Sequence, residues 1–404
     1  MILAATDPQQ LLDASRDVSF AFLSILFEGA PYILVGTLLS GFIDAFLPAK
    51  LLDKMLPKNK IFATLAAGFL GLIFPVCECA VVPVVRRLVQ KGLPLSCALA
   101  YLLSAPIVNP IVIVSTLTAF KEFQHQGHAA AYQETLAART ADGQAAGLGD
   151  HAAALQNALS QTGMTFARLS LGYVVAVLIG LVLLRKKPED VLAPSVVAGI
   201  AGGGGGGGHV HTPPDGVDAK LTHAMRTTMR DFLDTAMYFA IGVTITSVFN
   251  TQVDQTRIEA VSTNEFLAIP SMMGLAFILA LCSTSDAFIA APMAMPDSGL
   301  PSAAKLAFLV FGPMLDVKLV FMYASIFRRK FLIGLCIALF LMVALLSKPW
   351  ARIFFPEALT KKNATATQTV TPPSPAPAPA PAAPATTPPA PASPVPAPSP
   401  SPKP

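Results

Sequence analysis

The chain has 404 residues, of which 53% are hydrophobic and only 13% charged, and its mean hydropathy is +0.59. Because a soluble domain carries about 25% charged residues, this composition excludes a soluble globular protein and predicts an integral membrane protein. The formal net charge is +4, and no basic stripe with interleaved aromatic residues is present. Nucleic-acid binding is therefore not expected.

Eight apolar segments follow one another along the chain, each near the length that crosses about 30 Å of hydrocarbon. They cover residues 20–43, 61–85, 94–120, 166–184, 232–249, 266–294, 303–327 and 331–347. The pattern predicts an all-α, multi-pass protein embedded in the lipid bilayer. The first segment lacks a basic leader and a small-residue cleavage site, so no signal peptide is expected.

Polar regions divide this apolar chain into units. Residues 121–164 are a polar insert, residues 185–228 contain seven consecutive glycines, and the tail alternates Pro with Ala and Ser. Gly-rich and Pro-rich compositions predict flexible or extended segments that bury no core. The expected units are a first transmembrane half at 1–184, a linker at 185–228, a second transmembrane half at 229–347 and a disordered tail at 348–404.

The two apolar halves resemble each other in sequence. The stretch "EGAPYILVG" at residues 28–36 is matched 206 residues later by "DTAMYFAIG" at 234–242. The stretch "SAPIVNPI" at residues 104–111 is matched 207 residues later by "FGPMLDVK" at 311–318. The near-identical offsets predict an internal duplication.

Prolines interrupt corresponding segments of the two halves. Each proline of "APIVNP" removes a backbone donor and clashes with the preceding turn, and a membrane tolerates such a break only where protein or water satisfies the freed groups. Duplicated halves with matching broken helices are typical of secondary transporters whose site lies near the bilayer midplane.

Two topologies agree equally well with the basic residues of the loops. One has eight straight crossings. The other has inverted halves in which segments 61–85 and 266–294 are re-entrant hairpins, and we favour it because it gathers the short basic loops on one side.

Ionisable side chains inside the apolar segments indicate function, because a charge costs about 2.5–3.5 kcal/mol at a helix centre. They are Glu28, Glu78, Asp234, Asp286, Asp316 and Lys318. Asp316 and Lys318 would face different sides of a continuous helix, so each is expected to find its partner elsewhere. Burial disfavours the charged form of a carboxylate, and Glu78 and Asp286 are the candidates for carrying coupling protons. The alternative is that they cap broken helices.

The motif Cys77-Glu78-Cys79 directly follows Pro75, where the backbone is expected to be irregular. The two thiols can then converge on one ligand, with the carboxylate as a third donor or a proton acceptor. Thiolates select soft ions such as trivalent arsenic, zinc or copper(I), which makes Cys77 and Cys79 candidate metal ligands. The alternative is that these small residues only pack around the break.

The second half offers hydroxyls and an acid where the first offers thiols, in the segment "CSTSDA" at residues 282–287. Asn109 lies beside the backbone opened by Pro106 and Pro110, where its amide can recognise a solute or satisfy the freed groups. The candidate substrate-binding residues are Cys77, Glu78, Cys79, Asn109, Ser285, Asp286 and Asp316.

Enzymatic motifs are weak. No histidine lies in an apolar segment to serve a thiol as base, and the glycine run lacks the Lys-Ser/Thr of a phosphate-binding loop. The histidine pairs 125/128 and 209/211 lie in polar loops without further ligands, which makes them poor metal sites. We expect no enzyme activity and no bound cofactor. Transport would then draw on an ion gradient, of protons, or on a partner subunit.

The segments "FPVCECAVVPVVRRLVQKGLPLSCALAYLLSAPIVNPIV" (residues 74–112), "CSTSDAFIAA" and "GPMLDVKLVFMY" resemble the predicted permease family that includes YraQ-type and ArsP-type membrane proteins. The resemblance covers roughly residues 18–347, without the two polar inserts. It implies a multi-pass permease of the inner (cytoplasmic) membrane. ArsP-type members export trivalent organoarsenicals, whereas "CEC" is nearer to members without an assigned substrate.

The resulting prediction is a permease that exports a small polar or thiophilic solute, such as a trivalent arsenical or a soft metal species, with proton coupling. One alternative is a membrane scaffold or accessory subunit, which would not need the buried acids. The other is a membrane thiol oxidoreductase, which would need Cys77 and Cys79 to cycle through oxidation.

Overall fold

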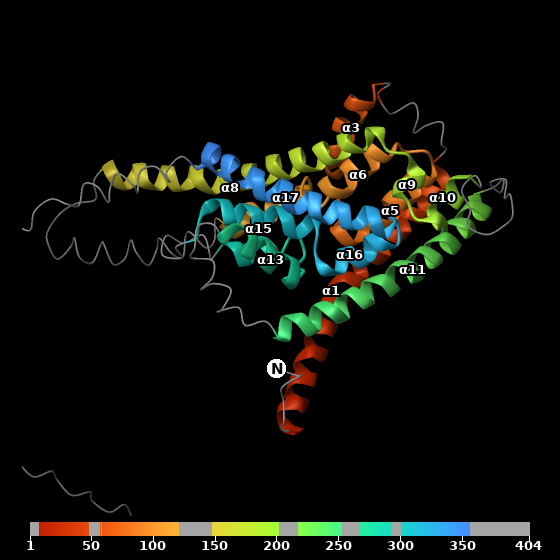
Figure 1. Ribbon diagram of the computed structural model, residues 1–404, viewed down its shortest axis with the longest axis horizontal. Helices are drawn as coiled ribbons and strands as arrows, with labels where there is room; N and C mark the ends of the chain where they lie inside the picture. The colour runs from red at the N-terminus through yellow and green to blue at the C-terminus, as the bar shows by residue number, and fades with distance from the viewer. Residues whose placement is uncertain are drawn as a thin grey trace, which may run out of the picture. The chain divides into compact units, whose positions relative to one another are not determined.

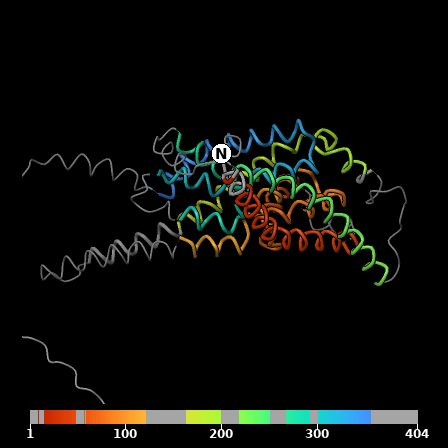
Figure 2. The backbone as a smooth tube through the Cα atoms, turned by 90° about the horizontal axis from the view of Figure 1, so that it is seen from below, coloured from red at the N-terminus to blue at the C-terminus, as the bar shows by residue number. Residues whose placement is uncertain are grey.

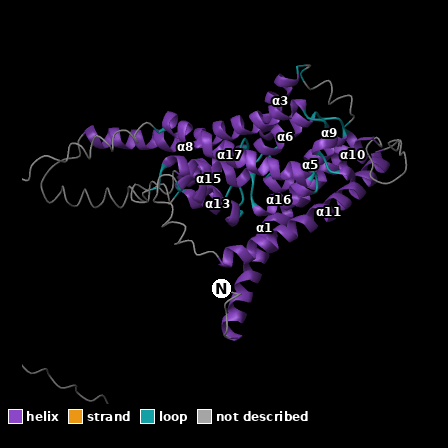
Figure 3. Ribbon diagram, viewed as in Figure 1, coloured by secondary structure: helices purple, strands orange, loops and turns teal. Residues whose placement is uncertain are grey.

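The computed structural model describes residues 8–47, 57, 59–120, 148–201, 217–252, 267–291 and 300–355. All regular structure in these residues is helical, apart from one isolated antiparallel bridge between Leu192 and Phe327 (Figure 3). The glycine run, the histidine pairs 125/128 and 209/211, most of the polar insert and the Pro-rich part of the tail lie outside the described residues.

Five helical stretches of the described residues are long and apolar enough to cross a membrane, judged by length and composition. Four lie within α1 (Pro8–Phe46), α8 (Leu148–Val182) with the adjoining 3-10 turn η2 (Leu183–Arg185), α11 (Val217–Gln252) and α17 (Arg329–Phe354). The fifth spans Ser302–Ala324 and comprises α15 (Ser302–Met314) and α16 (Val317–Ala324). The prediction of an all-helical polytopic membrane protein is confirmed.

The outer surface of the last helix shows why these sequences suit lipid. On α17 the side chains of Ile333, Ile337, Leu341 and Leu345 recur every four residues and are 52–72% exposed. Residues four apart lie on one face of a helix, so α17 presents a continuous apolar stripe outward. The same helix buries Leu335, Leu339 and Val343 on its other side.

Shorter helices result from the predicted breaks. They are α3 (Lys60–Gly68), α4 (Leu70–Ile73), α5 (Glu78–Gln90), α6 (Leu95–Ser104), the helix Pro110–Phe120, α13 (Ala268–Leu279) and α14 (Asp286–Ala290). The chain is non-helical between α4 and α5, and again between α13 and α14. Pro110 opens its helix at the first position, where its missing N–H costs nothing.

Two ranges expected to lack structure are partly helical. The range 185–228 contains α9 (Pro188–Val191), α10 (Pro194–Ala201) and the beginning of α11. Val191, Leu192 and Val196 are almost completely buried, so this connection packs against the helices. At the other end, α17 continues past residue 347 to Phe354.

The long helices form two pairs, and the shorter helices α5, α6, α15 and α16 lie between them (Figure 1). α1 packs along α11, and α8 packs along α17. Among the shorter helices, α5 packs on α1, α16 on α11, α6 on α8 and α15 on α17. The view turned by 90° shows part of the orange segment at the edge of the described helices, beside the teal segments (Figure 2).

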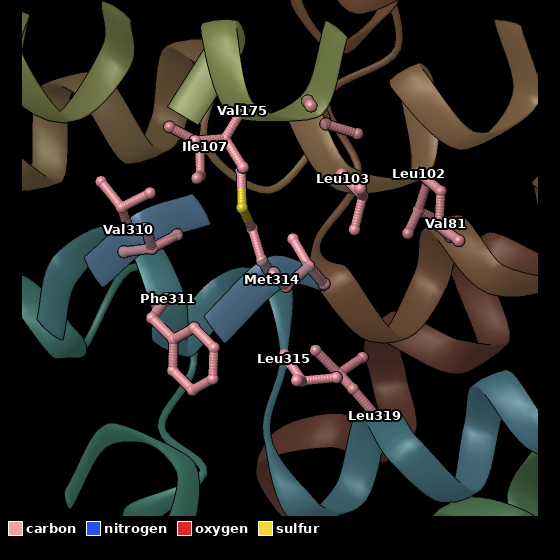
Figure 4. Packing of buried hydrophobic residues seen from close by; sticks show 14 of the residues in the cluster. Val81, Leu102, Leu103, Ile107, Val175, Val310, Phe311, Met314, Leu315 and Leu319 are labelled. Carbon is pink, nitrogen blue, oxygen red and sulfur yellow. The ribbon is translucent and has the colours of Figure 1, made fainter. Parts of the chain in front are cut away.

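The core between the halves is dense and apolar (Figure 4). The side chain of Met314 points from α15 toward Val175 of α8 and Ile107, and each of these residues is at most 1% exposed. Lipid tails are as apolar as these side chains, so close packing rather than the hydrophobic effect holds such helices together. The polar residues below are embedded in this core.

Close helix contacts position the breaks. A Cβ on Gly36 of α1 would lie 2.7 Å from the Ala80 Cα, and a Cβ on Gly242 of α11 would lie 2.7 Å from the Lys318 Cα. Real Cβ atoms do not come that close to a backbone, so glycine is required at both places. Each long helix thereby touches the first turn of a shorter helix, α5 or α16, that carries a buried charge.

Candidate functional site

The helix breaks of both halves meet at one buried polar cluster, which we define as Glu78, Asp286, Asp316, Lys318 and Arg168. Glu78 and Asp286 are the first residues of α5 and α14, and Asp316 is the N-cap of α16. Acids are favourable at these positions because the first backbone N–H groups are unpaired and the helix dipole is positive there. The Asp316 Oδ1 atom accepts the Leu319 N–H at 2.7 Å.

Glu78 connects the two halves. It is 1% exposed. The Lys318 Nζ atom donates to its Oε1 at 3.5 Å, and the Ser283 hydroxyl donates to its Oε2 at 2.9 Å. Both carboxylate oxygens of this first-half acid are therefore held by second-half residues.

Lys318 also contacts two further acceptors of the second half. Its Nζ atom donates to the Ala280 carbonyl at 2.9 Å and lies 3.5 Å from the Asp316 Oδ2. The expectation that Asp316 and Lys318 do not pair with each other is wrong. Asp316 has φ −135° and ψ 177°, so it lies in extended chain before α16, and the spacing rule for continuous helices does not apply.

Arg168 of α8 holds the second acid. Its NH2 nitrogen donates to the Asp286 Oδ2 at 2.7 Å and to the Ser283 carbonyl at 3.0 Å. Its NH1 nitrogen donates to the Thr116 hydroxyl at 2.7 Å. Arg168 and Asp286 are each 2% exposed, so this is a buried, charge-assisted pair of the strong kind.

The charges of the cluster do not balance. It holds three carboxylates and two cations, and each of the five residues is at most 4% exposed. With every group ionised, the cluster carries one surplus negative charge in a region where unpaired charge is costly. Among the described residues of the cluster, the Asp286 Oδ1 and Asp316 Oδ2 atoms are buried without a hydrogen-bond partner. One proton would neutralise the cluster.

Asn109 hydrogen-bonds to backbone groups on both sides of a helix break. Its Oδ1 atom accepts the Ile111 N–H at 3.0 Å, and its Nδ2 atom donates to the Val76 carbonyl at 3.3 Å. It therefore caps the helix Pro110–Phe120 and ties it to the chain just before Cys77. This geometry satisfies backbone groups near the break, which is the structural role that the sequence left open.

The thiols lie around the cluster. Cys77 and Cys282 are partly buried and Cys79 is 4% exposed. The side chain of Cys79 interacts with that of Cys77, and Cys282 lies within electrostatic range of Glu78 and Lys318. In the described part of the chain, no three His, Cys, Asp or Glu side chains are grouped so that they could hold a metal ion.

Ser285 lies at the outer side of the cluster. Its hydroxyl donates to the Glu28 Oε1 of α1 at 3.4 Å, in an exposed position. Two of the residues predicted from the sequence, Cys77 and Ser285, thus lie at the rim of the polar cluster and are partly buried. Glu78, Asp286 and Asp316 lie inside the cluster and are buried.

Sequence reasoning missed Arg168, Ser283 and Thr116. Arg168 lies in "MTFARLSLGYV", near the start of an apolar segment, where a cation usually reaches the membrane surface. Its distance in sequence from Asp286, 118 residues, gave no sign of the pairing. The signal that was present is a positive charge inside a segment that otherwise qualifies as membrane-spanning.

A family model described as "Predicted permease" (ArsP_1) matches residues 16–132 and 148–348. The chain belongs to this predicted permease family. The resemblance stated from the sequence is confirmed, and the matched residues contain the whole polar cluster.

Two relatives agree with this assignment. The chain is 32% identical over 311 residues to the "UPF0718 protein YcgR" of Bacillus subtilis, which covers 77% of this chain and 88% of that protein. It is 31% identical over 313 residues to the "Putative two-component membrane permease complex subunit" of Streptococcus mutans, which covers 77% of this chain and 87% of that protein. No solved structure matches the chain.

Proposed function

We propose that the protein is a secondary transporter that moves a small polar or thiophilic solute across the inner membrane, outward and in exchange for protons. The observation that carries the proposal is the buried cluster of three acids and two cations at the ends of broken helices. A protein that only packs in lipid has no use for charges in its core, since each costs several kcal/mol to bury. Glu78 and Asp286 are the proposed proton carriers.

The packing supports two duplicated halves. In the first half α3 packs on α6 and α6 on α8, and in the second half α13 packs on α15 and α15 on α17. α13 and α15 follow α3 and α6 at the offset of about 206 residues found in the sequence, whereas the offset from α8 to α17 is shorter because the polar insert precedes the apolar part of α8. We propose that the halves are inverted repeats with re-entrant breaks, because transporters of this kind place their site at the repeat interface.

The side chains around the rim favour a soft or polar solute. Thiols of Cys77 and Cys282 and the hydroxyl of Thr284 are partly buried there, and the Thr284 hydroxyl donates to the Cys282 sulfur at 3.6 Å. Thiols select soft species, so trivalent arsenicals and soft metal ions are the proposed substrates. A metal ion would be cargo at Cys77 and Cys79, and no resident cofactor is proposed.

A second candidate function is that of a subunit in a membrane permease complex. It is favoured by the printed name of the Streptococcus mutans relative, which describes a subunit of a two-component complex. In that case a partner would complete the pathway. The buried acids would still be needed if this chain contains the pathway, and would tolerate neutralisation if the partner contains it.

Flux measurements test the proposal. The full-length protein is reconstituted in vesicles, and efflux of trivalent organoarsenicals, Zn²⁺ and Cu(I) is followed under an imposed pH gradient. We expect Glu78→Gln to lose the effect of the gradient, and Cys77→Ser/Cys79→Ser to lose at least 90% of flux for one solute. Cys336→Ser, at a partly buried thiol of α17, is the matched control. Unchanged flux in both site variants would contradict the proposal.

A further inference from the structure

The chain between α13 and α14 is held by its neighbours rather than by a continuous helix. We call residues 280–286 the second-half turn. Three of its carbonyls are each held by a side chain of a different element. Lys318 of α16 donates to the Ala280 carbonyl at 2.9 Å, Arg168 of α8 to the Ser283 carbonyl at 3.0 Å, and Ser115 of the helix Pro110–Phe120 to the Thr284 carbonyl at 2.7 Å.

We propose that Arg168 is a positioning residue that holds the second-half turn against Glu78 while Asp286 is ionised, and that a proton on Asp286 releases the turn. The inference rests on the proposed function for the role of Asp286 as a proton carrier. It adds a residue and a movement that neither the sequence nor the family description assigns.

The geometry makes Arg168 the central contact. One guanidinium nitrogen contacts both the Asp286 carboxylate and the Ser283 carbonyl, while the Ser283 hydroxyl donates to Glu78 at 2.9 Å. A chain of hydrogen bonds therefore runs from Arg168 through Ser283 to Glu78. A shift of the Arg168 guanidinium would therefore move Ser283 and change its hydrogen bond to Glu78.

The charged groups around Asp286 determine how protonation of its carboxylate changes the polar cluster. It faces Arg168 from α8 and lies within electrostatic range of Glu78 from α5, and Lys318 with Asp316 lies on the other side of Glu78. A proton would form an O–H bond at the Asp286 Oδ1, which is buried without a hydrogen-bond partner in the described part of the chain; the Asp316 Oδ2 also has no hydrogen-bond partner there but lies 3.5 Å from the Lys318 ammonium. The cluster then becomes neutral, and Arg168 loses the opposite charge on Asp286, so that the ion pair becomes a hydrogen bond from a guanidinium to a neutral carboxyl group.

Thiol labelling in the full-length protein tests the movement without a transported solute. Cys282 lies in the turn and is partly buried, and Cys336 of α17 lies outside the turn and its ligands. The protein in lipid nanodiscs is treated with N-ethylmaleimide, and both thiols are quantified by mass spectrometry. Between pH 5 and pH 7.5, below the ordinary thiol pKa of about 8.5, the thiolate fractions of both residues change in parallel. The ratio of the two rates therefore reports on the turn.

We expect this ratio in the wild type to rise about tenfold as the pH falls from 7.5 to 5, which corresponds to about 1.4 kcal/mol of turn stability. In Asp286→Asn and Arg168→Gln it should be high and independent of pH. Arg168→Lys keeps the charge and should retain the pH dependence with a smaller amplitude. The double variant Arg168→Gln/Asp286→Asn removes both partners of this ion pair, so neither charge is left without the other, and it guards against a misfolded single variant.

Two results would overturn the inference. One is a wild-type ratio that does not change with pH while Arg168→Gln raises it at every pH, since Arg168 would then be purely structural. The other is an equal ratio in all variants. The proposed function fails separately: if the labelling behaves as expected and no solute is transported in the flux assay, the turn moves but the transport assignment is wrong.

Discussion

Removing the Lys318 ammonium is the sharpest test of the polar cluster. In Lys318→Met the side chain keeps most of its length, but Glu78 and Asp316 lose a cation that lies 3.5 Å from each. The Ala280 carbonyl also loses its donor at 2.9 Å. The variant therefore leaves two buried carboxylates with no cation from α16.

The expected loss follows from these contacts. Removing one partner of a buried ion pair costs about 3–5 kcal/mol. In chains of about 150–250 residues 1 kcal/mol shifts the melting temperature by roughly 2–4 °C and the shift falls with length, so at about 1–2 °C per kcal/mol we expect a decrease of about 3–10 °C. Fluorescence of the single tryptophan, Trp350, follows unfolding in detergent, because its indole N–H donates to Ser170 of α8 at 2.9 Å.

A double variant distinguishes the loss of the Glu78–Lys318 ion pair from a nonspecific loss of stability. Glu78→Gln/Lys318→Met removes one charge of each sign and should recover about half of the loss. Lys330→Met, at an exposed lysine on α17, is the matched control and should change the melting temperature by less than about 2 °C. If the two single losses simply add in the double variant, Lys318 and Glu78 are not energetically coupled, and the reasoning about the cluster is refuted.

Two further variants test how the helices are positioned. Gly242→Ala should destabilise by about 1–3 kcal/mol, because its Cβ would meet the α16 backbone, whereas Gly274→Ala has nothing within 4 Å and should be neutral or stabilising by thermal unfolding. Arg87→Lys should cost about 2–3 kcal/mol, because it loses the two-pronged contact with Asp231 at 2.8 and 2.9 Å. Arg86→Lys, whose 3.4 Å contact is solvent-exposed, should change stability by less than about 0.5 kcal/mol in the same assay.

The helix breaks can be predicted from the sequence where neighbouring residues, such as closely spaced prolines, determine them. A non-helical stretch was expected at Pro75 and around "APIVNP", and the chain is non-helical at residues 74–77 and before Pro110. Proline alone is a poorer guide, since Pro31 and Pro83 lie inside α1 and α5. Neighbouring helices can satisfy the backbone groups that such prolines free, and that compensation depends on packing that one sequence does not contain.

The partners of the buried charges could not be predicted. Glu78 and Asp286 were identified because a carboxylate in an apolar segment is costly wherever the chain folds. Their cations are 240 and 118 residues away, and no local rule connects positions so far apart. Arg168 was overlooked for that reason, and the pairing of Asp316 with Lys318 was missed because a helix was assumed where the chain is extended.

Ala280, the residue that ends α13, is a source of backbone strain in the second-half turn. Ala280 has φ 47° and ψ 46°, a left-handed conformation that costs a residue with a Cβ about 1–2 kcal/mol and that glycine would adopt freely. Lys318 holds this residue by its carbonyl. The backbone strain at Ala280 therefore favours a change in the conformation of the second-half turn. The hydrogen bonds from Lys318 and Arg168 to its carbonyls oppose that change.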